Sequence, residues 1–134
     1  MTARAITRAG TATVALLLIG ALSASAQLDA LKNTTPEERA KALTALMKTK
    51  LSLTADQLPK VADLNLSYAQ KMEPVIKGAA GPFRKMREAE RINRQKEAEL
   101  KQLLSPEQFN KYLAAKAAMR ERLAEKVEEK HEVQ

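Results

Sequence analysis

The sequence contains no cysteine and no tryptophan, and only two phenylalanines and two tyrosines among its 134 residues. Without cysteine, no disulfide can compensate for a thin core, even in an oxidising compartment. Four aromatic side chains in a short chain also leave little material for a deep hydrophobic core. We therefore expect stability to come from helix–helix packing, from dimerisation, or from both.

Histidine is nearly absent as well, since His131 is the only one and lies close to the C-terminus. A single terminal histidine excludes a His-based catalytic dyad or triad and cannot supply the three or four ligands of a zinc site. The methionines are widely spaced, which indicates core packing and not a copper-binding cluster. We expect no catalytic residue, no cofactor and no metal site. The glutamates between 88 and 99 alternate with Arg and Lys, which is typical of a salt-bridged surface.

The first 26 residues have the composition of a signal peptide. Arg4 and Arg8 precede the apolar run "TATVALLLIGAL", and Ala24-Ser25-Ala26 offers a cleavage site after Ala26. The alternative is an uncleaved anchor, but the run is shorter than the ~20 residues that span a bilayer. No cysteine follows the run, which excludes a lipoprotein. We expect an exported, periplasmic mature chain, 27–134, that forms one helical domain without stable membrane insertion.

The charge of the mature chain is positive but mixed. Removing the first 26 residues leaves 21 basic and 16 acidic side chains, a net charge of +5. Basic and acidic residues alternate through "RKMREAERINRQKEAELK", as on a solvated helix face. No stacking aromatics are interleaved with the cations, so we expect no nucleic-acid partner.

The phrase "LSLTADQL", residues 51–58, has the pattern of a helix start. Thr54 and Gln57 are spaced as a capping box, in which each side chain bonds the backbone N–H of the other residue. Leu53 and Leu58 occupy the two positions of a hydrophobic staple. Pro59 follows one residue later, and its ring conflicts with the carbonyl of residue 55. We therefore expect a distorted first turn, or a regular helix that begins nearer Pro59.

The phrase "LLSPEQF", residues 103–109, repeats this pattern. Ser105 and Gln108 form the second capping box, and Leu104 and Phe109 form the second staple. Pro106 lies at the first helical position, where its missing N–H costs nothing. One cap contributes about 1 kcal/mol. Each phrase alone predicts an ordinary helix start, and the presence of two in one short chain is more distinctive.

Hydrophobic periodicity and breakers predict an all-α chain with four helices, at about 36–50, 55–76, 83–103 and 106–128. Pro74 is expected to kink or end the second helix, and "KGAAGP", 77–82, is the clearest loop. The charged end "EKVEEKHEVQ", 125–134, is expected to fray.

The helix over 83–103 has an unusual stripe. Its 3-4 spacing selects apolar residues at both ends but Glu90, Asn93 and Glu97 in the middle. Such a helix is expected to be largely exposed, as in thin hairpins that form an open cradle and not a compact globular bundle. The helix carries seven cations against four glutamates, and long cations mixed with apolar side chains can bind flexible chains without a sharp pocket. The alternative is a solvated face with no ligand. The candidate client-binding residues are Phe83, Arg84, Met86, Arg87, Arg91, Ile92 and Arg94.

The two phrases, Leu53-Thr54-Ala55-Asp56-Gln57 and Leu104-Ser105-Pro106-Glu107-Gln108, resemble the paired LTxxQ motifs of the Spy/CpxP-like periplasmic proteins. The resemblance covers roughly residues 35–125. It implies curved helical hairpins that pair as an antiparallel homodimer with a basic concave face. It also implies ATP-independent chaperone activity or envelope-stress regulation. Metal-sensing relatives carry His or Cys ligands that have no counterpart in this sequence.

Three functions remain as hypotheses from the sequence. The first is a chaperone-like protein that binds unfolded or aggregation-prone envelope proteins. The second is a regulatory partner that docks onto the acidic periplasmic domain of a sensor. The third is metal binding or sensing. An enzyme is not expected.

Overall fold

The computed structural model describes residues 33–132, and within that range it contains four α-helices and no β-strand. These are α2 (Pro36–Leu51), α3 (Gln57–Lys77), α4 (Pro82–Leu103) and α5 (Pro106–Glu132). The prediction of an all-α chain with four helices is confirmed. The predicted signal peptide, 1–26, lies outside the described residues.

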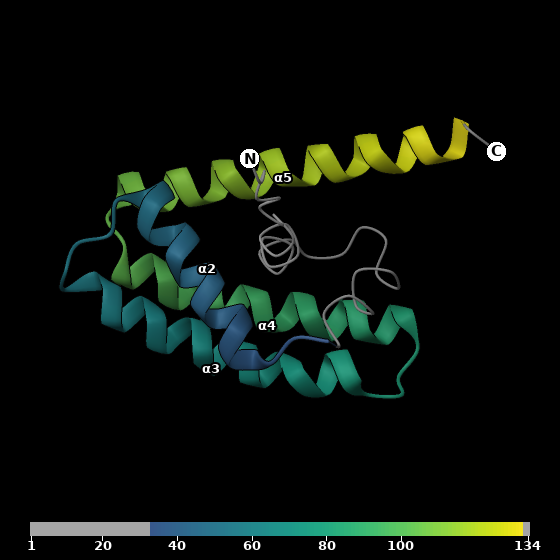
Figure 1. Ribbon diagram of the computed structural model, residues 1–134, viewed down its shortest axis with the longest axis horizontal. Helices are drawn as coiled ribbons and strands as arrows, with labels where there is room; N and C mark the ends of the chain where they lie inside the picture. The colour runs from purple at the N-terminus through teal and green to yellow at the C-terminus, as the bar shows by residue number, and fades with distance from the viewer. Residues whose placement is uncertain (1–32, 133–134) are drawn as a thin grey trace, which may run out of the picture.

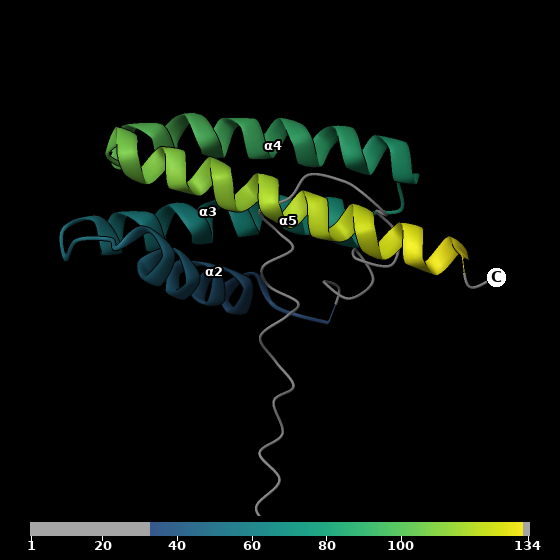
Figure 2. The same ribbon diagram turned by 90° about the horizontal axis from the view of Figure 1, so that it is seen from above.

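The helices pack around a hairpin formed by α3 and α4, which lie antiparallel along the long axis of the molecule (Figures 1 and 2). The short helix α2 packs mainly on α3. Helix α5 contacts both α2 and α4, but less extensively, and its C-terminal end extends past the ends of α3 and α4 in both views. Helix α5 is therefore anchored at its N-terminal end.

The core is a cluster of buried apolar side chains to which all four helices contribute. Leu43, Met47 and Leu51 recur every four residues and bury one face of α2. The other buried members come from α3, α4, α5 and the turn before α5: Val61, Leu64, Tyr68, Met72, Ile76, Ile92, Leu100, Leu104 and Tyr112. The core is narrow but continuous.

Local sequence chemistry sets the ends of α2. Thr35 is its N-cap and makes a capping box with Glu38, with N···O distances of 3.1 and 2.8 Å. The helix ends at Leu51, and the next residue, Ser52, has a left-handed backbone (φ 52°, ψ 53°). A left-handed residue directly after a helix allows the last carbonyls to be satisfied. Leu53 accordingly donates its N–H to the Lys48 carbonyl at 3.3 Å.

The distorted start predicted for the second helix is present. The regular helix α3 begins at Gln57 and not at 55, and Asp56 at the cap position makes no side-chain cap bond. Pro59 lies in the first turn of this helix. The Leu58 N–H donates to the Thr54 carbonyl at 3.0 Å, and Pro59, one residue later, has no N–H to donate to residue 55. Pro74 does not end the helix, which continues to Lys77.

The buried face of α4 differs from the predicted stripe. Ile92, Lys96 and Leu100 are buried, with Ala89 half-buried on the same side, while Glu90, Asn93 and Glu97 are not buried. The inward stripe is thus rotated by about one residue, because Ala89 and Ile92 offer more apolar contact than Glu90 and Asn93. Most of the remaining α4 side chains are exposed or half-buried, as the polar composition of the helix predicts.

The C-terminal end of α5 was expected to stop near 128, but the helix continues to Glu132. Its last residues are rich in Glu and Lys, which have high helix propensity.

Candidate functional site

The two phrases selected from the sequence form two capping boxes in the structure. In the first, the Gln57 N–H donates to Thr54 Oγ1 at 3.2 Å, and the Thr54 N–H donates to Gln57 Oε1 at 3.0 Å. In the second, the Gln108 N–H donates to Ser105 Oγ at 3.2 Å, and the Ser105 N–H donates to Gln108 Oε1 at 2.9 Å. The two boxes thus have the same bonds at nearly the same lengths.

The structure also brings the two boxes together, which the sequence did not indicate. Gln57 Nε2 donates to Gln108 Oε1 at 2.7 Å, and Gln108 Nε2 donates to Gln57 Oε1 at 2.9 Å. Each amide therefore donates to and accepts from the other. This reciprocal pair, the amide pair, joins residues 51 positions apart.

Each glutamine also bonds a backbone carbonyl at the end of another helix. Gln57 Nε2 donates to the Leu103 carbonyl at 3.1 Å, and Gln108 Nε2 donates to the Leu51 carbonyl at 3.2 Å. Leu51 and Leu103 are the last residues of α2 and α4. The amide pair therefore ties the α2–α3 turn to the α4–α5 turn with an approximate two-fold relation.

The apolar members of the motifs line this junction. Leu104 is buried, while Leu53 and Phe109 are half-buried and pack against the core cluster. The Phe109 ring stacks on Tyr112 with a centroid separation of 5.9 Å. Leu58 is half-buried. The motif residues are thus a structural joint between two helix pairs.

The candidate client-binding residues of α4 divide into two groups. Phe83 is 81% exposed, Arg84, Arg87, Arg91 and Arg94 are exposed, and Met86 is half-buried. Ile92 is only 4% exposed and belongs to the core cluster. Assigning Ile92 to the surface was therefore wrong, because Ile92 lies on the α4 face that packs against α3.

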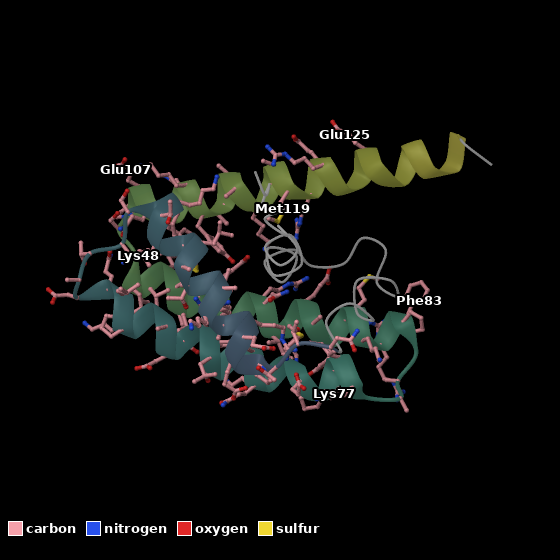
Figure 3. The ribbon with its side chains drawn as sticks, in the orientation of Figure 1. Lys48, Lys77, Phe83, Glu107, Met119 and Glu125 are labelled. Atoms are coloured by element: carbon pink, nitrogen blue, oxygen red, sulfur yellow. The ribbon has the colours of Figure 1, made fainter. Side chains whose placement is uncertain are left out.

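The four arginines, at positions 84, 87, 91 and 94, recur every three or four residues and so share one face of α4. That face is turned away from Ile92, Lys96 and Leu100. Arg91 pairs with Glu88, and Arg94 pairs with Glu90 at 3.6 Å. Within residues 33–132, neither Arg84 nor Arg87 has a carboxylate within ion-pair distance. We call these four residues the arginine face. Figure 3 shows Phe83 at the N-terminal end of α4.

Two glutamates of α4 also accept hydrogen bonds from neighbouring helices. Glu97 accepts from Lys116 Nζ and, at 3.4 Å, from the Tyr112 hydroxyl, and these bonds join α4 to α5. Glu99 accepts from the Tyr68 hydroxyl on α3. Burial, with the nearby Glu99, raises the pKa of Tyr68 to about 12. The glutamates predicted to form a salt-bridged surface thus include two that join helices.

Residues 25–112 match a family model described as "Domain of unknown function (DUF4890)". The chain belongs to the DUF4890 family. Comparisons with curated proteins and with solved structures return no match. The DUF4890 match includes both capping boxes and ends at Tyr112, the last buried residue described on α5. The region shared with the family therefore contains the whole joint.

Two buried cations were not identified from the sequence. Arg39 is fully buried on α2, donates to the Thr34 carbonyl and pairs with Glu73 on α3. Burial alone would raise the pKa of Glu73, but bonds from Lys77 and Arg39 outweigh it and lower the pKa. Lys96 on α4 is 6% exposed. The spacing of Ala89, Ile92, Leu100 and Leu103 could have indicated that Lys96 is buried. Position 96 lies on the same helix face, where it completes that apolar stripe.

The described part of the chain contains no metal-ligand cluster and no membrane-spanning helix. Among the side chains that the structure describes, no group of three or more His, Cys, Asp or Glu is placed to hold a metal ion. None of the four described helices has a segment long and apolar enough to cross a membrane. The His131 side chain lies outside the described residues.

Proposed function

We propose that the protein is an exported, ATP-independent chaperone-like protein that binds unfolded or aggregation-prone envelope proteins. The observation that carries this proposal is the outer surface of α4. A phenylalanine that is 81% exposed lies beside four exposed arginines, two of which have no carboxylate partner within residues 33–132. An exposed apolar group next to unpaired cations suits weak contacts with flexible or acidic chains.

The export part of this proposal rests on the N-terminal sequence. The basic start, the short apolar run and Ala24-Ser25-Ala26 fit cleavage after Ala26 and release into the periplasm. The DUF4890 match begins at residue 25. N-terminal sequencing of the protein recovered from a periplasmic fraction tests this step, and a chain retained with Met1 in the membrane fraction would contradict it.

The proposal also includes a homodimer. The described core is narrow, and the C-terminal end of α5 extends past the other helices, so a second copy could cover α5 in an open, cradle-like assembly. The paired LTxxQ-like motifs support this arrangement by resemblance. Sedimentation equilibrium gives the mass directly, and a monomer at all concentrations would remove the dimer from the proposal.

A competing function is a regulatory partner that docks onto an acidic sensor domain. Arg84 and Arg87 favour it, because unpaired exposed cations attract an acidic surface in a salt-dependent manner. The two functions differ in the number of partners. A chaperone protects many unrelated unfolded proteins, whereas a regulator binds one folded partner with fixed stoichiometry.

The deciding experiment is light scattering of an unrelated denatured protein diluted into buffer without ATP. The wild-type chain is compared with Arg84→Glu/Arg87→Glu, which reverses the unpaired half of the arginine face. Lys41→Glu/Lys60→Glu is the matched control, because both lysines are exposed and the change in net charge is the same.

We expect the wild type and the lysine control to suppress scattering, and the arginine variant to suppress it less. No suppression by the wild type at large excess would overturn the chaperone proposal. Equal suppression by all three proteins would show that the clients bind elsewhere.

A further inference from the structure

A small cavity of about 20 Å³ lies where α2, α3 and α4 meet. Arg39, Asn65 and Lys96 are among the residues that line it, one from each helix. A cavity of about 10–15 Å³ is large enough to hold one water molecule. The cavity therefore has room for one water or one small ion.

One of the two cations that line this cavity, Lys96, lacks a carboxylate partner among the described residues. Two cations line it, and no aspartate or glutamate does. Arg39 pairs with Glu73, but Lys96 has no carboxylate within ion-pair distance in residues 33–132. The adjacent Glu97 is engaged by Lys116 and Tyr112. A charged Lys96 would thus lack a counter-charge supplied by the described chain.

Burial has a measurable consequence for Lys96. It lowers the pKa of Lys96 to about 7, an effect that the nearby Glu97 opposes only in part. The other charged or titratable groups that face the cavity are Arg39 from α2 and Tyr68 from α3, whose hydroxyl is bonded to Glu99. None of these supplies a negative charge to the Lys96 amine, because Tyr68 is neutral over the ordinary pH range.

We propose that this cavity is a binding site for one small inorganic anion of about the size of chloride, held by the Lys96 ammonium with the Arg39 guanidinium in the cavity wall. An anion supplies the missing counter-charge, which a water does not, and a buried charge is stable only when it is paired. A volume of about 20 Å³ suits a monatomic anion better than an organic acid or a phosphate ester.

Asn65 adds a second polar group to the site. Its Nδ2 donates to Thr44 Oγ1 at 2.9 Å, whereas its Oδ1 is buried and has no hydrogen-bond partner among the described residues. An ammonium has three N–H donors. The Asn65 oxygen accepts none of them, so all three donors of Lys96 remain for the anion.

The test uses the purified protein and chloride as the probe. Thermal unfolding is followed in sodium chloride and in sodium gluconate at equal ionic strength, because gluconate is too large for the cavity. At about pH 6, where Lys96 is charged, each tenfold rise in chloride above its dissociation constant should raise Tm by about 5 °C or more. At about pH 9 the increase should be much smaller, since a neutral Lys96 attracts no anion.

Two variants isolate the site. Lys96→Met keeps the length of the side chain but removes the charge, so it should fold stably and lose the chloride-specific increase. Lys101→Met removes an exposed lysine of the same helix and should retain that increase. Asn65→Asp adds a carboxylate to the cavity wall, and it should also make Tm independent of chloride.

Chloride-35 NMR gives a readout that does not depend on stability. The wild type and Lys101→Met should broaden the chloride line more than Lys96→Met does. Equal Tm values in chloride and gluconate, or an equal chloride response in Lys96→Met, would overturn the proposal and leave a water as the occupant.

Discussion

The side-chain amides of Gln57 and Gln108 donate to and accept from each other, at 2.7 and 2.9 Å, across the junction of two helix pairs. Each amide oxygen also accepts a backbone N–H in its own capping box. Each amide nitrogen also donates to the last residue of another helix. A capping box accepts Glu or Gln at this position, but only an amide can donate the bonds between the two turns.

This difference predicts the effect of replacing glutamine with glutamate at the joint. Gln108→Glu keeps the acceptor for the Ser105 N–H but removes the donor to Gln57 Oε1 and to the Leu51 carbonyl. We expect a loss of about 1–3 kcal/mol in the free energy of unfolding, because two bonds are removed at a half-buried site. Urea unfolding followed by circular dichroism measures it.

The control for this variant is Glu38→Gln, in the capping box of α2. That box has the same internal bonds, and Glu38 makes no bond to a second box. Its free energy of unfolding should change by less than about 0.5 kcal/mol. The double variant Gln57→Glu/Gln108→Glu should lose more than the two single variants together, because it places two carboxylates side by side. An additive double variant would contradict the amide pair.

The helix starts could be predicted from the sequence, but the joint between them could not. Thr54 with Gln57, and Ser105 with Gln108, are local patterns whose bonds span only two intervening residues. The bonds between Gln57 and Gln108 depend on how α3 and α5 are placed by the whole core. The glutamines were identified as important residues, and their second role depends on tertiary structure alone.

The buried face of α4 was predicted only approximately from the sequence. Two stripes of residues on this helix compete for the inward position, and both include Leu100. One runs through Glu90, Asn93 and Glu97, and the other through Ala89, Ile92 and Lys96. Each stripe contains polar residues. The charge of Lys96 favours an outward position, although the aliphatic stem of a lysine can be buried. Surface membership was therefore correctly predicted for the arginines and Phe83, and wrongly for Ile92.

The burial of Lys96 predicts a pH dependence of stability. Its pKa is about 7 in the folded protein and about 10.4 in an unfolded chain. Between these values the unfolded chain binds the proton and the folded protein does not. The free energy of unfolding should therefore rise with pH from about 7 upward, by at most about 1.4 kcal/mol per unit, and this contribution should be flat below pH 7.

Chemical unfolding in a chloride-free buffer between about pH 6 and pH 9 measures this slope. Tyr68 limits the upper end, because its raised pKa makes the folded protein less stable relative to the unfolded chain above about pH 10. Lys96→Met should be more stable at pH 7 and should lose the slope, whereas Lys101→Met should keep it. A wild-type slope that persists in Lys96→Met would assign the pH dependence to another group.

The loop between α3 and α4 offers a matched pair of glycines. A Cβ at Gly78 would lie 2.5 Å from the Pro74 carbonyl oxygen, whereas a Cβ at Gly81 would have nothing within 4 Å. Gly78→Ala should therefore cost about 1–3 kcal/mol, because the end of α3 must shift. Gly81→Ala should be neutral or stabilising by up to about 1 kcal/mol, since its backbone is already extended. Similar unfolding midpoints for the two variants would contradict the close approach at Gly78.

The exposed side chain of Phe83 allows client binding to be tested separately from stability. Its side chain is 81% exposed, so Phe83→Ser removes almost no buried area and should change the free energy of unfolding by less than about 0.5 kcal/mol. The same variant should suppress the aggregation of a denatured client less than the wild type does, because it removes the largest exposed apolar group beside the arginine face. Leu113→Ser, on α5, is the control, since Leu113 is also exposed, at 40%, but lies on another helix. Equal loss of suppression in both variants would mean that general surface hydrophobicity, and not the α4 surface, holds the client.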